Sequence, residues 1–148
     1  MIGRLLAQRG GKLTALEHDP AWAQIVRSQI ERERLHDAVE VVASSLEPHP
    51  ASWSGAPWYS QESTGLLPGA ISLLLVDGPP GYGEGMSHSR YPALRALGDR
   101  IEEGGLVALD DADRDPEREI LARWAEEMPA WTFGVDPASG LAIGRRSG

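Results

Sequence analysis

Short apolar runs alternate along the chain with amphipathic stretches, and turn-forming residues separate the two. Ile71–Val76 (ISLLLV) is almost wholly apolar, a pattern typical of a strand buried on both faces in the middle of a parallel sheet. Lys12–Glu17, Ala38–Ala43 and Leu106–Leu109 are further predicted strands. The last two predicted strands are Trp131–Val135 and Leu141–Arg145. Only Asp136–Gly140 separates them, and this spacing favours an antiparallel hairpin.

Two helices are predicted in the first third of the chain. Ile2–Gln8 has the pattern of the tail of a helix that ends at Gly10–Gly11. Asp19 is a good N-cap for a second helix, because Pro20 fits the first helical position. Four apolar residues predict the inner face of that helix: Trp22, Ile25, Val26 and Ile30.

Two more helices are predicted in the second half. Ser89–Glu103 is expected to be helical up to Gly104–Gly105, with one apolar stripe of Tyr91, Leu94, Leu97 and Ile101. Asp115–Pro116 repeats the N-cap signature, and Pro129 ends that helix. Its predicted inner face consists of Ile120, Leu121, Trp124 and Met128.

Residues 47–70 form the least regular part of the chain. They contain four prolines, the aromatic residues Trp53, Trp58 and Tyr59, and no helical period. Loops of this length in compact domains are usually functional or disordered, and the aromatic residues favour an ordered flap or hairpin. A packing role and a substrate-facing role both remain open for them.

The alternation of strands and helices predicts one α/β domain over residues 1–148, with a mainly parallel sheet, helices on both faces and a C-terminal antiparallel hairpin. The net charge of −8 argues against a nucleic acid or an anionic membrane as the main partner. The absence of Cys excludes disulfides and thiolate chemistry. No signal peptide or membrane-length apolar run is present, so we expect a cytoplasmic protein.

Polar residues follow four of the predicted strands. They are Glu17, Ser44–Ser45, Asp77 and Asp110–Asp111. In parallel sheets the carboxyl ends of the strands share one edge, where ligands bind. The sequence therefore predicts one site there, although a strand-end Asp that caps its own loop would explain Asp77 as well.

This ordered set resembles the class I S-adenosylmethionine-dependent methyltransferases over nearly the whole chain. The resemblance depends on LEHD (Leu16–Asp19), VVASS (Val41–Ser45), LLVDGPPG (Leu74–Gly81) and GGLVALDDADR (Gly104–Arg114). It implies a Rossmann-like sheet with strand order 3-2-1-4-5-7-6, in which the seventh strand is antiparallel.

The resemblance also implies roles for individual residues. Glu17 looks like the acidic residue that accepts both ribose hydroxyls of the cofactor, and His18 would lie beside the adenine. Ser44 and Ser45 stand where the family contacts the adenine edge, often with an Asp. Asp77 matches the strand-end position nearest the transferred methyl group.

Asp77, Asp110 and Asp111 further resemble the magnesium site of catechol-type O-methyltransferases, although Asp111 stands where that subgroup usually has Asn. Oxygen ligands of this kind suit a hard cation. The alternative is that Asp110 and Asp111 cap the following loop and pair with Arg114. His88, in the segment after Asp77, is the acid–base candidate; Tyr82 and Arg90 are candidates for substrate contact, whereas Tyr91 suits packing.

The family's Gly-rich turn, E/D-x-G-x-G after its first strand, does not occur in the sequence. Residues 81–85 (GYGEG) follow a different strand. We therefore expect the family's first strand to be missing and the fold to be partial, so that these residues alone bind the cofactor weakly or not at all.

The sequence hence predicts methyl transfer from S-adenosylmethionine to a small molecule, with a hydroxyl as the expected acceptor. Two other readings stay open, and a third is less favoured. A non-catalytic α/β interaction domain would use Trp53, Trp58 and Tyr59 as a binding surface. A nicotinamide-dependent dehydrogenase shares the strand-end carboxylate, and a hydrolase lacks support because no G-x-S-x-G motif occurs.

Overall fold

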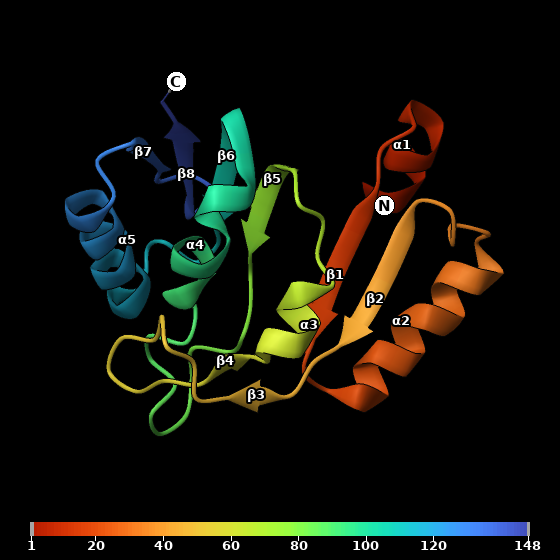
Figure 1. Ribbon diagram of the computed structural model, residues 1–148, viewed down its shortest axis with the longest axis horizontal. Coiled ribbons are helices and arrows are strands. Elements are labelled where there is room, and N and C mark those ends of the chain that lie inside the picture. Colours follow the sequence, from red (N-terminus) through yellow and green to blue (C-terminus); the bar gives the residue numbers. More distant parts are fainter. Residues whose placement is uncertain (1, 148) are drawn as a thin grey trace. The chain divides into compact units, whose positions relative to one another are not determined.

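Two parallel strand pairs form the framework of the protein, as the computed structural model shows for residues 2–147 (Figure 1). Strand β1 (Leu13–Glu17) pairs in parallel with β2 (Val39–Ala43). Strand β5 (Ile71–Val76) pairs in parallel with β6 (Ile101–Leu109). The predicted strands are confirmed at all four positions, and β6 begins five residues before the expected Leu106.

The C-terminal hairpin is also confirmed. Strand β7 (Trp131–Asp136) and β8 (Leu141–Arg146) pair antiparallel, and β8 pairs antiparallel with β6. The resulting sheet has the order β5-β6-β8-β7, which is the 4-5-7-6 portion of the expected family order. The α/β class, the parallel pairs and the antiparallel hairpin therefore agree with the prediction.

The chain divides into two compact units. The first contains the residues up to Glu47 together with Tyr59–Leu67, and the second contains Pro48–Trp58 and the residues from Pro68 onward. The prediction of one domain over the whole chain stays a prediction.

In the first unit, helix α1 (Ile2–Arg9) precedes β1, and helix α2 (Pro20–Arg32) packs on the β1–β2 pair. Ala23 and Ile30 of α2 form a small core with Val41 of β2. Asp19 caps α2 as predicted, because its carboxylate accepts from the amides of Ala21 (2.8 Å) and Trp22 (3.2 Å).

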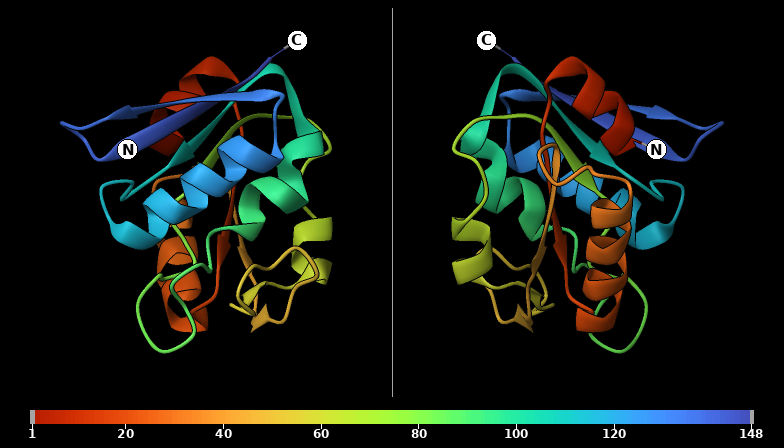
Figure 2. Two further views of the ribbon diagram at one scale, coloured as in Figure 1. Left: turned by 90° about the vertical axis from the view of Figure 1, so that its left-hand side faces the viewer. Right: turned by 90° about the vertical axis from the view of Figure 1, so that its right-hand side faces the viewer.

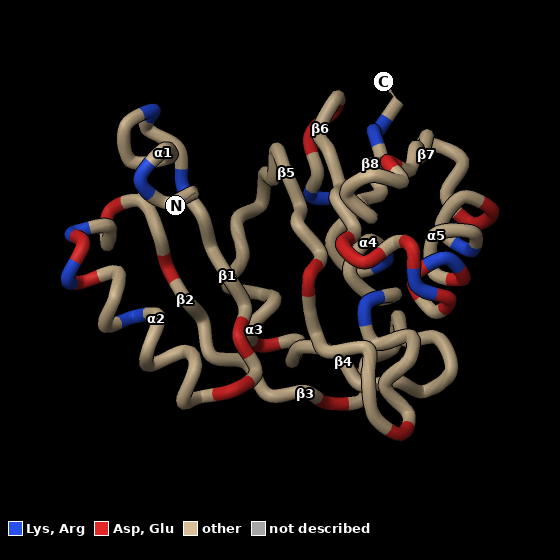
Figure 3. The backbone as a smooth tube through the Cα atoms, turned by 180° about the vertical axis from the view of Figure 1, so that it is seen from behind, with Lys and Arg blue, Asp and Glu red and all other residues tan. Residues whose placement is uncertain are grey.

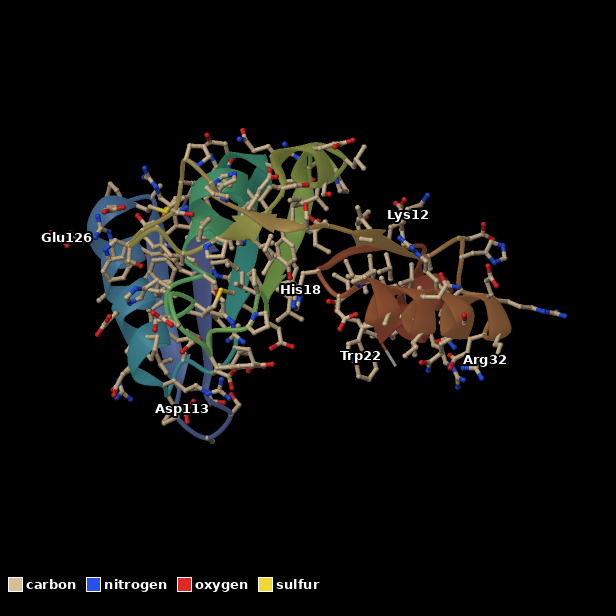
Figure 4. The ribbon with its side chains drawn as sticks, turned by 90° about the horizontal axis from the view of Figure 1, so that it is seen from below. Lys12, His18, Trp22, Arg32, Asp113 and Glu126 are labelled. Atoms are coloured by element: carbon tan, nitrogen blue, oxygen red, sulfur yellow. The ribbon has the colours of Figure 1, made fainter. Side chains whose placement is uncertain are left out.

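The predicted inner face of α2 is only partly right. Ile30 is buried, but the side chains of Trp22 and Ile25 are 59% and 53% exposed, and Val26 is exposed too. Figure 4 shows Trp22 directed away from the strands. A two-stranded sheet covers only a narrow stripe of the helix, and Ala23 and Ile30, seven positions apart, occupy that stripe.

In the second unit, helix α4 (Pro92–Leu97) and helix α5 (Asp115–Glu127) lie on the same face of the four-stranded sheet (Figure 2). All four residues of the predicted α4 stripe are buried, as are Ile120 and Trp124 of α5. The helix is shorter than predicted: a 3-10 turn (Gly98–Arg100) follows α4, and Ile101 already pairs with Ile71 in the sheet. Gly104–Gly105 thus lie inside β6 and do not end a helix.

Two further predictions are corrected here. Asp115 is the first residue of α5, and the cap position is Arg114, which makes no side-chain cap hydrogen bond. The two-face burial of Ile71–Val76 is wrong as well. Strand β5 is an edge of its sheet, and Leu73 and Leu75 are 51% and 56% exposed. The two side chains point to the same face, and within the second unit α4 and α5 both cover the opposite face.

The irregular segment contains only short elements. Strand β3 (Leu46–Glu47) pairs with β4 (Trp58–Tyr59), and helix α3 (Gln61–Gly65) follows. Within residues 2–147, no helix combines the length and the apolar character that crossing a membrane requires.

Candidate functional site

Three carboxylates meet at the carboxyl ends of β5 and β6. Asp77 directly follows β5, and Asp110 and Asp111 follow β6; one ligand oxygen from each lies within 4.8 Å of the others. The parallel register explains this proximity, because Val76 lies opposite Leu109 and the Asp110 amide donates to the Val76 carbonyl at 3.0 Å. The predicted cluster at this sheet edge is therefore present.

Arg90 is the cation at the base of this cluster. Its side chain is 5% exposed, and its guanidinium lies 3.1 Å from Asp111 Oδ2, 3.3 Å from Glu117 Oε1 and 3.8 Å from Asp77 Oδ1. It also donates to three carbonyl oxygens at 3.0–3.2 Å, those of Asp77, Pro79 and Asp110. Arg90 thus ties both strand ends and the intervening loop to α5 from inside the protein.

Asp111 is held from two sides. Besides Arg90, the guanidinium of Arg114 lies 2.8 Å from Asp111 Oδ2, so the predicted Arg114 pair is present together with the cluster. Asp111 has φ of 58°, in the left-handed region that Asp tolerates better than most side chains.

All three carboxylates offer oxygens that suit a hard divalent cation, but one oxygen of Asp111 is already paired. Asp77 and Asp110 offer carboxylate oxygens, the ligand type that Mg²⁺ prefers. Asp111 Oδ2 is already occupied by two guanidinium groups, which offset its charge. A carboxylate paired in this way resembles the neutral Asn of the magnesium-dependent subgroup more closely than a free Asp would.

The environment raises the pKa of two acids here. Loss of solvent around the carboxyl, and then the neighbouring Asp110, raise the pKa of Asp77, while Arg90 acts in the opposite direction. Burial also raises the pKa of Glu117, and Arg90 again opposes that shift. Sequence reasoning missed Glu117, because an acidic residue in a first helical turn usually faces solvent and stabilises the helix dipole.

At the end of β1, Glu17 and His18 are both about one-third exposed. Glu17 Oε1 accepts from the Asp19 amide at 2.8 Å and lies 3.1 Å from His18 Nδ1. One carboxylate oxygen thus orders the turn into α2, and these contacts leave Oε2 for other donors. Figure 4 shows His18 at this strand end, where it was predicted.

Ser44 and Ser45 differ in solvent exposure and therefore in whether they can contact a ligand. Ser44 is 3% exposed, and its hydroxyl lies in a buried network that also contains Ser60 and Ser63 at the start of α3. Ser45 is exposed, and its carbonyl accepts from the Ser60 amide at 3.0 Å. Of the two, Ser45 is therefore the residue open to a ligand.

His88 is engaged at both ring nitrogens. Nε2 lies 2.7 Å from Glu119 Oε2 and Nδ1 lies 3.0 Å from Ser54 Oγ, while the ring stacks on Trp53. In this arrangement neither nitrogen is open to a substrate proton. Tyr82 is 79% exposed, whereas Tyr91 is buried and donates to Glu127 Oε2 at 2.5 Å, which confirms its packing role.

A sequence model of the methyltransferase domain family matches residues 1–112. The chain belongs to this family. Comparison with curated protein sequences found no significant match.

Solved structures of methyltransferases share the fold. An O-methyltransferase of Bacillus cereus in complex with S-adenosylhomocysteine is 19% identical with a TM-score of 0.59, over 93% of this chain and 64% of that one. A methyltransferase of Podospora anserina with bound S-adenosylhomocysteine is 15% identical with a TM-score of 0.63, over 93% and 61%. A methyltransferase of Geobacter sulfurreducens is 13% identical with a TM-score of 0.59, over 93% and 59%. The chain thus spans about three-fifths of the length of these relatives.

Proposed function

We propose that the protein transfers a methyl group from S-adenosylmethionine to a hydroxyl of a small molecule. The observation that supports this most is the pairing of acidic strand ends with parallel strands: Glu17 after β1, and Asp77 and Asp110 after β5 and β6. In open α/β sheets this end of the strands binds ligands. Two of the structural relatives contain the product form of this cofactor.

For the cofactor, we propose that Glu17 accepts the ribose hydroxyls, chiefly at Oε2, because Oε1 already accepts from the Asp19 amide. His18 would lie beside the adenine and Ser45 would contact its edge. Asp77 would lie near the sulfonium group. In-line displacement at a methyl carbon needs alignment above all, so these residues act mainly by positioning.

For the acceptor, Asp77, Asp110 and Asp111 would hold a magnesium ion, which when bound orients a hydroxyl and lowers its pKa. The chain's own contribution is the fixed arrangement of these carboxylates by Arg90 and Arg114. We assign no proton transfer to His88, since both its ring nitrogens are occupied. The net charge of −8 favours a small acceptor over a nucleic acid.

The second candidate is a non-catalytic interaction domain. The expected binding surface of Trp53, Trp58 and Tyr59 does not support it, because Trp58 and Tyr59 are buried. Its support is instead the exposed apolar side chains of Trp22 and Ile25 in the first unit and, separately, of Leu73 and Leu75 in the second. Such a domain would bind no cofactor.

A methyl-transfer assay separates the two candidates. Radiolabelled S-adenosylmethionine is incubated with catechols, other phenols and sugars, with and without Mg²⁺. Activity that D110N abolishes and D113N preserves would support the proposal, since Asp113 lies in the same loop but outside the cluster. Absence of label on every acceptor, with both variants folded, would favour the interaction domain.

A further inference from the structure

Strand β7 has an open outer edge at one end of the four-stranded sheet. Among residues 2–147, no strand pairs with β7 on the side away from β8. The expected family order also ends at this strand, whereas it places a further strand beside β5, the other open edge. Natural edge strands are often protected from other chains by lysine, proline or a bulge. Residues 131–136 (WTFGVD) contain neither lysine nor proline, and their register with β8 is unbroken, so this edge is open to a partner strand.

The hydrogen bonds between β7 and β8 determine which backbone groups of β7 face the open edge. The Ser147 amide donates to the Ala130 carbonyl at 2.8 Å, and this pair continues the β7–β8 register by one position. In an antiparallel pair, hydrogen-bonded positions alternate along each strand. The even-numbered residues of β7 therefore bond to β8, and the backbone groups of Trp131, Phe133 and Val135 face outward.

These outward groups form a self-complementary set. The Trp131 amide already donates to the Met128 carbonyl at 3.0 Å, which leaves the amides of Phe133 and Val135 and the carbonyls of all three residues. When a second β7 runs antiparallel with the two Phe133 residues opposite each other, each Phe133 amide meets the other Phe133 carbonyl. Each Val135 amide meets the Trp131 carbonyl of the other strand. Both remaining outward amides of each strand thus find an acceptor.

We propose that two copies of the chain pair through β7 in this register, so that their four-stranded sheets join into one. The side chains of Trp131, Phe133 and Val135 share one face of the strand. It is the face of α5, because the Phe133 ring stacks on Trp124 with centroids 6.3 Å apart. Pairing places Val135, which is 49% exposed, beside Trp131 of the second copy, and it places the half-buried Phe133 rings side by side. Aromatic and β-branched cross-strand pairs of this kind stabilise sheets.

The remaining positions of β7 also permit a second copy. Asp136 is the ionisable side chain of the strand, and it comes to lie opposite Ala130 of the other copy, so no like charges face each other. On the opposite face Thr132 lies opposite Gly134, where a Cβ atom would meet nothing within 4 Å. Since the free amides, the apolar side chains and the charges all match in one register, we assign the edge to a second copy and not to an unrelated strand.

The expected dimer is weak. One pair of six-residue strands is expected to bury less than the roughly 1,200 Å² at which standard protein interfaces begin. We therefore expect the dimer to form at high protein concentration and to dissociate on dilution. Neither cofactor nor methyl acceptor takes part, so the proposal is independent of the proposed function.

Sedimentation equilibrium from about 10 to about 500 µM covers the range expected for such a small interface. We expect the wild-type mass to rise from monomer toward dimer over this range. V135K should stay monomeric, because the pairing would bury its charge against Trp131, and Val135 is exposed enough in the single chain to tolerate lysine. T132K is the matched control: it adds the same charge to the same strand at an exposed position on the other face, and should dimerise as wild type.

Amide hydrogen exchange followed by NMR tests the register itself. At high concentration the amides of Phe133 and Val135 should gain about tenfold protection, whereas those of Thr132 and Gly134, which already bond to β8, should change little. Amides of β6 and β8 report whether each variant is folded. A wild-type chain that is monomeric throughout, equal dimerisation of V135K, or a dimer without protection at Phe133 and Val135 would overturn the proposal.

Discussion

Arg90 Nη1 lies 3.1 Å from Asp111 Oδ2 inside the second unit, and the same oxygen meets Arg114 from the solvent side at 2.8 Å. The two arginines differ sharply in exposure, at 5% and 55% of their side chains. Because Asp111 pairs with one buried and one exposed arginine, the contributions of the two arginines to the free energy of unfolding can be compared directly.

R90M should be strongly destabilising, by about 3–5 kcal/mol, because it leaves Glu117 buried without its counter-charge and removes three hydrogen bonds to carbonyls. R114M should cost less than about 1 kcal/mol, as is usual for an exposed pair. Urea unfolding followed by tryptophan fluorescence measures both. Equal effects would show that Arg90 does not hold the cluster together.

D77N should raise the melting temperature at pH 7. The raised pKa of Asp77 means that the native state binds its proton more tightly than the unfolded chain. Its contribution to stability is therefore complete below the unfolded value of about 3.9 and is lost as the pH rises through the raised folded value. Calorimetry should show the gain at pH 7 and none near pH 3, and D113N serves as the control. A less stable D77N at pH 7 would contradict this electrostatic account.

Y91F should destabilise the second unit by about 1 kcal/mol at pH 7, since the phenol donates to a partly exposed carboxylate. The Tyr91 hydrogen bond lowers the pKa of Glu127, so its stabilising effect is present above the unfolded value of about 4.3. The difference between wild type and Y91F should hence shrink as the pH falls through the folded value. Thermal unfolding at pH 7 and pH 3 measures it, and a constant difference would count against the contact.

D19A should cost about 1 kcal/mol and reduce the helical signal of α2, because two amides at its first turn lose their acceptor. D37A, at a side chain that is 96% exposed, should have little effect. Circular dichroism during urea unfolding compares the two. Equal stability of D19A and D37A would show that the cap does not contribute.

The sequence predicted the elements of this fold well because apolar period and turn residues act locally. The predictions of side-chain burial failed where burial depends on which other helices and strands pack against the element. The run Ile71–Val76 has the composition of a central strand, yet it occupies an edge. The stripe of α2 faces a sheet too narrow to cover Trp22 and Ile25.

At the site, the positions of the carboxylates could be predicted because each one follows the end of a strand. The hydrogen-bond and ion-pair partners of the site's side chains could not be predicted in this way. The buried position of Arg90 depends on contacts with residues 11 to 27 positions away along the chain, such as Pro79 and Glu117, which no local pattern encodes. Ser44 was expected to face a ligand, whereas its hydroxyl joins Ser60 because α3 returns to the end of β2. Figure 3 shows acidic and basic residues interspersed along α5, so charge pattern alone does not single out Glu117.

Calorimetric titration of S-adenosylhomocysteine tests the central claim most directly. The titration uses these 148 residues and, in parallel, a form with any residues that the gene encodes upstream. We expect saturable binding by at least one form, and at least tenfold weaker binding in E17Q, which keeps an acceptor for the Asp19 amide but loses the charge. E40Q, at an exposed position of β2, should bind as wild type. Absence of binding by both forms while they are folded, or unchanged binding in E17Q, would contradict the proposed cofactor site.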